Sequence, residues 1–471
     1  MNIRLVLNLM GKALVLLGLA MLFPLFWAVF DHGPDQTAFI YSMIITLFSG
    51  LLITLVSPKQ GEIRYREGFA VVTIGWLLIS LYGCLPYLFS GVCTNFIDAF
   101  FETISGFTTT GASIFANVEA LPRGILFWRC LTQWLGGMGI IVFLVALLSH
   151  LGVGANRIFR AEIPGLTYKV LPRISETAQV LWFTYLLMTV IETGILCLLG
   201  MPLFDSLCHT FGSMATGGFN IKNASVGHYG QASIQWVITL FTFLAGANFA
   251  LYYLSFRQRS LKVFWRNEEF RFYFIVVLLA VVVAVLNNLS LFGSVEELFR
   301  VSAFQVVSIV TTTGYTNTDF NRWPYMSQAL LLVLMFIGGC SGSTSGSIKA
   351  GRILILLKQT VLEIKKLIHP RAVFSLKIGG KQVSKETVSN VTQFFFLYVS
   401  IVVVSSVALT GMGLDMMTAF DYVAASFGNL GLAGDFSVLP GAGKLLLGFL
   451  MLLGRLEIYT VIVMFAPSFW K

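Results

Sequence analysis

The chain has few charged residues and few residues suited to catalysis in water. Only 11% of its 471 residues are charged, and it has five histidines and six cysteines. The histidines are scattered, and neither an HExxH motif nor a pair of carboxylates lies within an apolar run, so no catalytic constellation is present. We therefore predict that the protein is not an enzyme and has no organic cofactor.

The cysteines also exclude a thiol-based metal site. They show no CxxC pair and no metal-binding spacing, and most lie in apolar sequence, where a free thiol packs as a small hydrophobic side chain. A disulfide between Cys84 and Cys93 is the open alternative for that pair.

Long apolar runs dominate what is present. The chain is 56% hydrophobic with a mean hydropathy of +0.82, which is typical of a polytopic membrane protein. A helix needs about 20 mostly apolar residues to cross a bilayer. Runs of suitable length lie near 5–30, 36–57, 68–91, 124–150, 178–202, 231–256, 270–293, 324–357, 386–412 and 441–467. The first is too long for a signal peptide and lacks a small-residue cleavage site, so we interpret it as a retained helix.

The distribution of Lys and Arg predicts the orientation in the membrane. With the N-terminus inside, 24 of the 31 basic residues fall on the cytoplasmic side, in 4–66, 157–173, 257–271 and 349–385 and at Lys471. We therefore expect a multi-pass protein of the cell inner membrane, surrounded by lipid. The inside loops account for the net charge of +9 and imply no nucleic-acid partner. Most acidic residues then lie outside, where their field would concentrate cations; alternatively, these are simply charged loops.

Four short glycine-centred segments recur between the apolar runs. They are TTTGAS (108–113), MATGGFN (214–220), TTTGYTN (311–317) and FGNLGLAG (427–434), and they align on Gly111, Gly217, Gly314 and Gly431. About 12 residues precede each glycine, half of a membrane span, which favours a re-entrant hairpin. We predict an all-α fold with two N-terminal helices in 1–67 and four helix/pore-helix/helix repeats in 68–150, 178–256, 270–357 and 386–467, around a central pseudo-fourfold pore.

The chemistry of these segments suits a monovalent cation. Irregular backbone at membrane depth is tolerated where it lines water, and rings of carbonyl oxygens can replace the hydration shell of an ion. Glycine permits the dihedral angles that turn successive carbonyls inward, and the descending helices point their partly negative C-termini at the pore. A single TTTG string is more simply explained by helix packing, but four strings in phase favour the pore.

The third repeat contains a string that disfavours a continuous helix. Residues 336–352, FIGGCSGSTSGSIKAGR, place Gly and Ser through the middle of an apolar run. We expect a broken helix whose loop lies beneath the glycine ring and obstructs the pore; a mere kink is the alternative. Intramembrane arginines are costly, so we expect Arg455 to face the pathway and to meet carbonyls of this loop. Glu192 is interpreted as a structural partner.

The four glycine segments, the string GGCSGSTSGSIKAGR, the cytoplasmic HPRAV with the following IGGK, and the closing LLGRLEIYTVIVMF together resemble the Trk/Ktr/HKT superfamily of potassium uptake proteins. The two additional N-terminal spans and the closing motif make the Trk-type membrane subunits the nearer match. The resemblance covers essentially the whole chain. It implies potassium uptake, a homodimer with one pore per protomer, and gating by a cytosolic, TrkA-like ring of nucleotide-binding regulatory subunits.

The resemblance also implies site residues. The potassium filter would comprise Thr109, Thr110, Gly111, Ala215, Thr216, Gly217, Thr312, Thr313, Gly314, Asn429, Leu430 and Gly431. The gate, in the loop 338–347, would comprise Gly338, Gly339, Ser341, Gly342, Ser343, Thr344, Ser345 and Gly346, with Arg455 as the internal barrier. In this family Gly at the position of Gly111 goes with potassium selectivity.

Two features leave alternatives open. The fourth segment has Asn429-Leu430 where the first and third have Thr-Thr, and the second has Met214-Ala215, so the ring is chemically unequal and its selectivity over sodium is expected to be looser. Uptake is expected to be passive or ion-coupled. The alternative is a sodium-coupled solute or cation symporter, for which two inverted repeats with broken helices would be expected.

Overall fold

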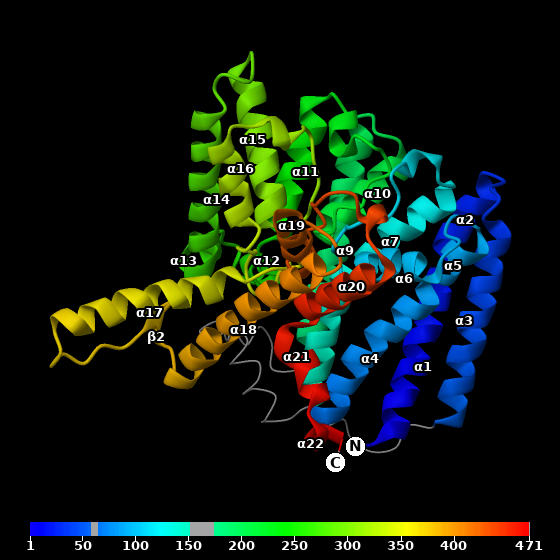
Figure 1. The fold of residues 1–471 in the computed structure, drawn as a ribbon, viewed down its shortest axis with the longest axis horizontal. Coiled ribbons are helices and arrows are strands. Elements are labelled where there is room, and N and C mark those ends of the chain that lie inside the picture. Colours follow the sequence, from blue (N-terminus) through cyan, green and yellow to red (C-terminus); the bar gives the residue numbers. More distant parts are fainter. Residues whose placement is uncertain (58–64, 151–173, 471) are drawn as a thin grey trace.

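The computed structural model describes residues 1–57, 65–150 and 174–470, and these are almost entirely helical (Figure 1). Both termini lie at the same end of the molecule. The basic segment 157–173, together with Lys59, Arg64 and Lys471, lies outside the described residues. Its predicted cytoplasmic position therefore stays a prediction.

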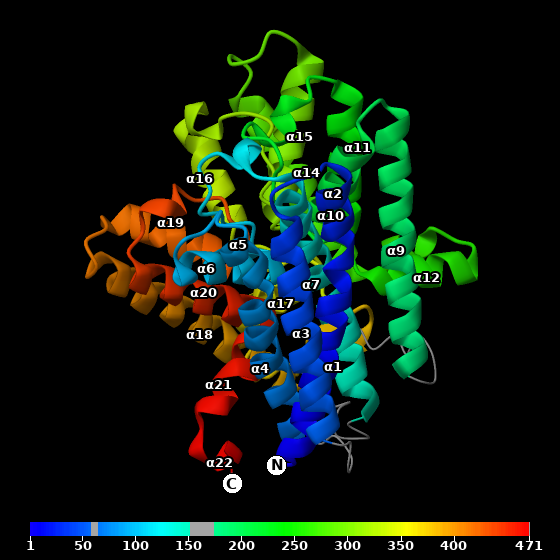
Figure 2. The same ribbon diagram turned by 90° about the vertical axis from the view of Figure 1, so that its right-hand side faces the viewer.

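The N-terminal helices form a closely packed pair at one side of the molecule. They are α1 (Ile3–Ala20), which continues into α2 (Leu22–Phe30), and α3 (Gln36–Val56). α1 and α3 lie side by side in both views (Figures 1 and 2). A Cβ on Gly11 would lie 2.4 Å from Thr54 Oγ1, and one on Gly50 would lie 2.8 Å from the Gly11 oxygen. Small residues therefore let these two helices approach backbone to backbone.

Four units of outer helix, pore helix and inner helix follow in chain order. The first comprises α4 (Tyr65–Gly83), α6 (Phe96–Phe107) and α7 (Arg123–His150), and the second α9 (Ile174–Leu198), α10 (Leu203–Met214), α11 (Ala232–Ala245) and α12 (Phe249–Gln258). The third comprises α14 (Glu268–Asn287), α15 (Val295–Val310), α16 (Tyr325–Leu334) and α17 (Ala350–Ile368). The fourth comprises α18 (Lys385–Thr410), α19 (Met416–Phe427), α20 (Gly441–Leu456) and α21 (Ile458–Ile462). The predicted all-α fold with four such units is confirmed.

Short elements connect these helices. They are α5 (Leu85–Phe89), α13 (Lys262–Arg266), α22 (Pro467–Trp470), and the 3₁₀ turns η1 (Val118–Ala120), η2 (Ser225–His228), η3 (Phe320–Arg322), η4 (Phe436–Val438) and η5 (Val463–Phe465). A two-stranded antiparallel hairpin, β1 (Lys377–Ile378) and β2 (Lys381–Gln382), turns at Gly379 and Gly380, both with positive φ. These two glycines supply the backbone that a two-residue hairpin turn requires.

The pore helices are too short to cross a membrane. α6, α10 and α19 have 12 residues and α15 has 16. The side chains of Asn95, Ser294 and Asp415 accept backbone N–H groups at the starts of α6, α15 and α19, which fixes where these helices begin. Each of the four ends at the start of its glycine segment or directly before it, so the partly negative C-termini are placed at these segments.

Within the described ranges, six helices are long and apolar enough to span a membrane, or up to eight if each sharply bent pair counts as one span. Large apolar side chains such as Phe48, Leu55 and Leu198 are exposed on these helices, as lipid-facing residues are. The apolar run 324–357 contains no continuous helix, because α16 ends at Leu334 and α17 begins only at Ala350.

Two other inner helices bend within the apolar runs 231–256 and 441–467, each of which is long enough for a single span. α11 and α12 meet at 92°. Gly246 ends α11, and the side chain of Asn248 accepts the N–H of Ala250 to start α12 in a new direction. The last inner helix bends by 115° after Leu456, where Glu457 adopts a φ of 61°. Capping and left-handed backbone, rather than a loss of apolar character, cause both bends.

Candidate functional site

The four glycine segments form a closed ring. A Cβ built on the glycine of each segment would collide with a main-chain oxygen of the next segment in chain order, and the fourth segment closes onto the first. The contacts are Gly111 to the oxygen of Gly217 (2.1 Å), Gly218 to that of Thr313 (1.9 Å), Gly314 to that of Leu430 (2.2 Å) and Gly431 to that of Thr110 (2.4 Å). Such a cyclic set of contacts requires that the four segments surround one axis.

The backbone of the ring repeats in all four segments. In each segment, the residue that directly follows the C-cap of the pore helix has a positive φ. The glycine two positions further along also has a positive φ. The first set is Thr109, Thr216, Thr312 and Asn429 (φ 52–58°), and the second is Gly111, Gly218, Gly314 and Gly431 (φ 68–83°). L-residues disfavour this left-handed region, yet Thr and Asn adopt it at the first position. Glycine occupies the second position because a Cβ there would also lie 1.9–2.4 Å from a main-chain oxygen of the next segment.

This geometry corrects the predicted register of the second segment. Gly218, not Gly217, carries the positive φ and the contact to the next segment. The residue between the two left-handed positions donates its N–H to a carbonyl five residues earlier: Thr110 to Ser105, Gly217 to Gly212, Thr313 to Ser308 and Leu430 to Ala425. The alignment on Gly217 is therefore wrong by one residue. Two adjacent glycines in MATGGFN made the choice ambiguous in the sequence.

The same shift changes the chemistry of the ring. The residues equivalent to Thr109-Thr110 in the second segment are Thr216-Gly217, whereas the alignment on Gly217 pairs them with Ala215-Thr216. Met214 is the last residue of α10 and Ala215 is its C-cap. Three of the four segments therefore carry Thr at the first left-handed position, and only the fourth differs, with Asn429.

Side chains of the ring residues are buried and bonded to one another. The Oγ1 atoms of Thr108 and Thr110 lie 2.8 Å apart, as do those of Thr311 and Thr313. Asn429 donates its Nδ2 to Thr110 Oγ1 at 3.0 Å, which joins the fourth segment to the first. These hydrogen bonds link side chains within the first and third segments and join the fourth segment to the first.

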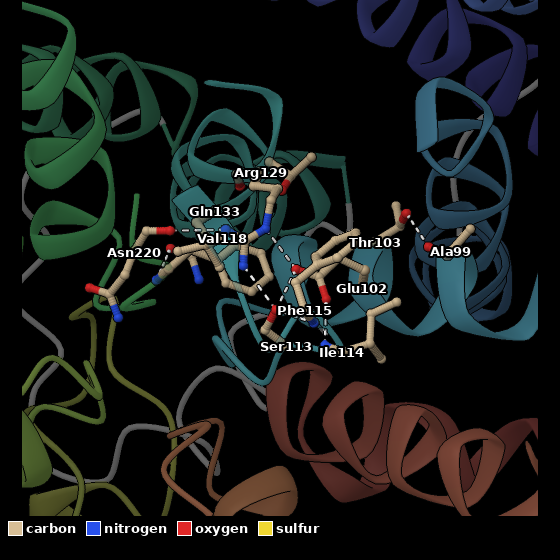
Figure 3. A network of polar contacts seen from close by, with 12 residues as sticks. Ala99, Glu102, Thr103, Ser113, Ile114, Phe115, Val118, Arg129, Gln133 and Asn220 are labelled. Carbon is tan, nitrogen blue, oxygen red and sulfur yellow. Dashed lines mark hydrogen bonds and ion pairs between the residues drawn. The ribbon is translucent and has the colours of Figure 1, made fainter. Parts of the chain in front are cut away.

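A buried ion pair lies beside the first two glycine segments (Figure 3). Arg129, on α7, donates its Nε to Glu102 Oε1 on α6 at 2.7 Å, and both side chains are at most 1% exposed. Glu102 also accepts the N–H of Ile114 at 2.9 Å, and Arg129 Nη1 donates to the main-chain oxygen of Asn220 at 2.9 Å. The pair thus ties the chain that follows the first glycine segment to the last residue of the second.

The non-helical stretch between α16 and α17 lies against the ring. The N–H of Gly346 donates to Thr312 Oγ1 at 2.7 Å, and Thr344 Oγ1 lies 3.3 Å from Thr216 Oγ1. Thr344 Oγ1 also donates to the oxygen of Met214 at 3.0 Å, at the C-terminus of α10. The predicted gate residues Gly338, Gly339, Ser341, Gly342, Ser343, Thr344, Ser345 and Gly346 all belong to this stretch. The loop is therefore held by side chains and backbone of two different ring segments.

Arg455 reaches the same loop from the last turn of α20. Its Nη1 donates to the oxygen of Thr344 at 2.6 Å and its Nη2 to the oxygen of Gly136 at 3.2 Å, while the residue is only 4% exposed. The expected contact between Arg455 and a loop carbonyl is present. Glu457 forms an ion pair with Arg352 of α17, so the two charges of the closing motif have separate partners.

Several buried side chains that hold the loop and the ring were not predicted. Glu269 accepts the N–H group of Ser341, within the loop, at 2.7 Å and that of Gly351, in the first turn of α17, at 2.9 Å. Gln133 binds the backbone of the second ring segment. The only signal available for either was a polar residue next to or within an apolar run. Glu192, interpreted as structural, accepts the hydroxyl of Ser213 at 2.5 Å.

Other candidate sites are absent from the part of the chain that the structure describes. No group of three His, Cys, Asp or Glu side chains in it is arranged to hold a metal ion. Cys84 and Cys93 are free buried thiols, as are Cys130, Cys208 and Cys340, while Cys197 is a partly exposed free thiol. The alternative disulfide between Cys84 and Cys93 is therefore wrong.

Comparison with known proteins identifies relatives along the whole chain. The chain is 39% identical to the Trk system potassium uptake protein TrkH of Salmonella typhimurium and 36% identical to TrkG of Escherichia coli; the alignments cover 100% of this chain and 100% and 99% of those proteins. Its fold superimposes on the crystal structure of the potassium transporter TrkH from Vibrio parahaemolyticus with a TM-score of 0.92, at 36% identity and complete coverage of both chains.

A sequence model of one family matches nearly the entire chain. It is the TrkH family, described as a cation transport protein, and the match covers residues 34–471. These relatives are transport proteins and not enzymes, in agreement with the absence of a catalytic constellation from the sequence. The chain belongs to the TrkH family of cation transport proteins.

Proposed function

We propose that this protein takes up potassium ions across the cytoplasmic membrane through a filter of main-chain oxygens. The closed ring of four glycine segments carries this proposal, because it gathers carbonyl groups around one axis in an otherwise apolar molecule. The names of its full-length relatives, which are potassium uptake proteins, support the choice of ion.

The proposed filter follows the corrected register. It consists of Thr109, Thr110 and Gly111; Thr216, Gly217 and Gly218; Thr312, Thr313 and Gly314; and Asn429, Leu430 and Gly431. A potassium ion would exchange its hydration shell for main-chain and threonine oxygens of this set. The C-termini of four pore helices add partial negative charge, which favours a cation and disfavours an anion.

The stretch 338–347 is proposed to be the gate and Arg455 its barrier. The loop contacts ring residues Thr216 and Thr312 directly, and the guanidinium beneath it places a full positive charge next to the path of a cation. Both obstruct conduction while they stay in place. If the loop moved away from Thr312, the hydrogen bond between Thr344 of the loop and Arg455 would have to break as well.

Assembly and orientation complete the proposal. We place the N-terminus in the cytoplasm of the cell because Lys and Arg are concentrated on that side of the predicted topology. A homodimer with one pore per protomer and a cytosolic, TrkA-like regulatory ring follow from the family resemblance. The basic residues of α17 and of the β1–β2 hairpin would be exposed to such a ring.

Flux measurements test the proposal. Purified protein in liposomes should pass K⁺ and Rb⁺ in preference to Na⁺, without a requirement for a sodium or proton gradient if uptake is passive. Flux of K⁺ that follows an imposed sodium or proton gradient would identify coupled transport. Equal permeability for K⁺, Na⁺ and chloride would refute a carbonyl filter.

A sodium-coupled solute or cation symporter is the second candidate. The observation in its favour is that inner helices bend sharply at short breaks, between α11 and α12 and between α20 and α21, and broken helices form the binding sites of secondary transporters. Uptake of an organic solute that depends on Na⁺ would support it. The fourfold ring favours the potassium pathway over this alternative.

A further inference from the structure

One carbonyl of the ring is held by a side chain from a neighbouring unit. Gln133, on the inner helix α7 of the first unit, donates its Nε2 to the main-chain oxygen of Gly217 at 2.7 Å. Its Oε1 accepts the N–H of Phe219 at 2.9 Å, and the side chain is fully buried. Both ends of the amide are therefore used on the backbone of the second ring segment.

Gln133 binds the ring at a position where the ring residue is a glycine and has no side chain. The residues between the two left-handed positions are Thr110, Gly217, Thr313 and Leu430, and only Gly217 lacks a side chain. A Cβ on Gly217 would lie 2.6 Å from Cδ of Gln133. Gln133 thus occupies the volume that a side chain fills in the other three segments.

The oxygen of Gly217 is also the one that closes the ring between its first two segments. It lies 2.1 Å from the position that a Cβ on Gly111 would occupy. Among the hydrogen bonds of the described residues, the equivalent oxygens of Thr110, Thr313 and Leu430 receive no side-chain donor. The four equivalent carbonyl groups therefore differ, because among the described residues only that of Gly217 accepts a hydrogen bond from a side chain.

A second residue of α7 secures the same stretch of chain. Arg129 precedes Gln133 by four residues, so both side chains lie on one face of the helix. Arg129 donates to the oxygen of Asn220 at 2.9 Å, and Figure 3 shows Arg129 and Gln133 converging on this region. Three backbone groups between Gly217 and Asn220 are thus set by one helix face. Because two of these bonds come from a single neutral amide, its replacement changes ring geometry without changing charge.

We propose that Gln133 is a positioning residue for ion selectivity, which fixes the Gly217 carbonyl and thereby the width of the ring at its first junction. This inference rests on the proposed potassium function. A neutral hydrogen bond contributes about 0.5–1.5 kcal/mol. Loss of the bond to the Gly217 oxygen should therefore lower the discrimination between K⁺ and Na⁺ by roughly two- to tenfold.

The test compares two variants that keep volume and remove the donor, Gln133→Met and Gln133→Leu. Gln328→Met is the matched control, because Gln328 donates its Nε2 to the main-chain oxygens of Asn321 and Trp323 away from the ring. The ratio of K⁺ to Na⁺ flux in liposomes is measured for each. The concentrations of KCl and NaCl that give half-maximal thermal stabilisation are measured in parallel, since ion binding does not need an open gate.

We expect both Gln133 variants to lose K⁺ preference in flux and in stabilisation, while Gln328→Met keeps the wild-type ratio. An unchanged ratio in a variant that remains monodisperse would overturn the inference and leave the potassium function intact. Failure of both Gln133 variants to fold, with Gln328→Met intact, would also overturn it, because Gln133 would then hold the fold rather than the selectivity. Absence of K⁺ preference in the wild-type protein would instead refute the proposed function.

Discussion

Nη1 of Arg455 lies 2.6 Å from the main-chain oxygen of Thr344, which joins the last inner helix to the loop beneath the ring. The hydroxyl of Thr344 in turn donates to the oxygen of Met214, at the end of a pore helix. A charge on one repeat is therefore connected through two contacts to the ring segment of another. Replacement of Arg455 by an uncharged residue removes this contact to the loop and also removes a positive charge from the proposed path.

Replacement of Arg455 should open the pathway. We expect Arg455→Ala to raise K⁺ flux in liposomes by roughly tenfold or more without the regulatory subunit, because a hydrogen bond from a charged group contributes about 1.5–3 kcal/mol. The control is Arg322→Ala, whose side chain is 85% exposed and pairs with Asp319. Unchanged flux through Arg455→Ala would contradict its role as the barrier.

The register of the second segment predicts a position where no side chain fits. Gly218 has a φ of 73°, and a Cβ there would lie 1.9 Å from the oxygen of Thr313. Gly218→Ala should therefore abolish selective K⁺ flux. Gly194→Ala is the control, because nothing lies within 4 Å of a Cβ at that helical position. If the Gly218→Ala variant conducts K⁺ selectively, the ring of four glycine segments does not form the selectivity filter.

The first segment offers the sharpest test of selectivity. Gly111→Ser places a Cβ 2.1 Å from the oxygen of Gly217, at a φ of 83°, so that carbonyl has to move. We expect relative Na⁺ permeation to rise by several-fold, which the ratio of Na⁺ to K⁺ flux in liposomes measures. A variant whose ion preference equals that of the wild type would argue against the filter assignment.

Glu269 should restrain the gate loop through its hydrogen bonds. Its Oε1 accepts the N–H groups of Ser341 and Gly351, so Glu269→Met leaves two backbone donors without an acceptor. The loss at the buried Ser341 donor should cost about 1–3 kcal/mol. We expect a lower midpoint of thermal unfolding and higher basal K⁺ flux.

The neighbouring residue, Glu268, provides the control for the restraint by Glu269. Glu268 binds Lys358 and the N–H of Gly379, outside the loop. Glu268→Met should leave basal flux at the wild-type level. Equal flux in both variants would mean that Glu269 stabilises the fold without restraining the loop.

The buried pair of Arg129 and Glu102 should matter for stability. Removal of one partner leaves an uncompensated buried charge, so Arg129→Met is expected to lower the free energy of unfolding by about 3–5 kcal/mol. The double variant with Glu102→Met should lose less than Arg129→Met alone. Unfolding in detergent measures both, and Arg322→Met, from an exposed pair, should cost about 0–1 kcal/mol. A larger loss in the double variant would show that the apolar replacement packs poorly.

Local properties of the sequence were sufficient to predict the class of protein and its repeats. Apolar runs, the bias of Lys and Arg, and four glycine strings at similar spacing are all readable without knowledge of contacts. The short polar-to-apolar stretch before each string also predicted pore helices, because a helix that is half of a span cannot cross a bilayer. Phe96–Phe107 and Met416–Phe427 have that length.

Tertiary structure alone decided the register of the ring and the partners of the buried polar residues. Gly217 and Gly218 are chemically identical in the sequence, and only the backbone φ and the contact to Thr313 distinguish them. Gln133, Glu102 and Glu269 each bond to groups that are 12 to 86 residues away in the chain. A polar residue near an apolar run signals that it needs a partner, but long-range packing determines which backbone group that partner is, since hydrogen bonds depend on position in space and not on separation along the chain.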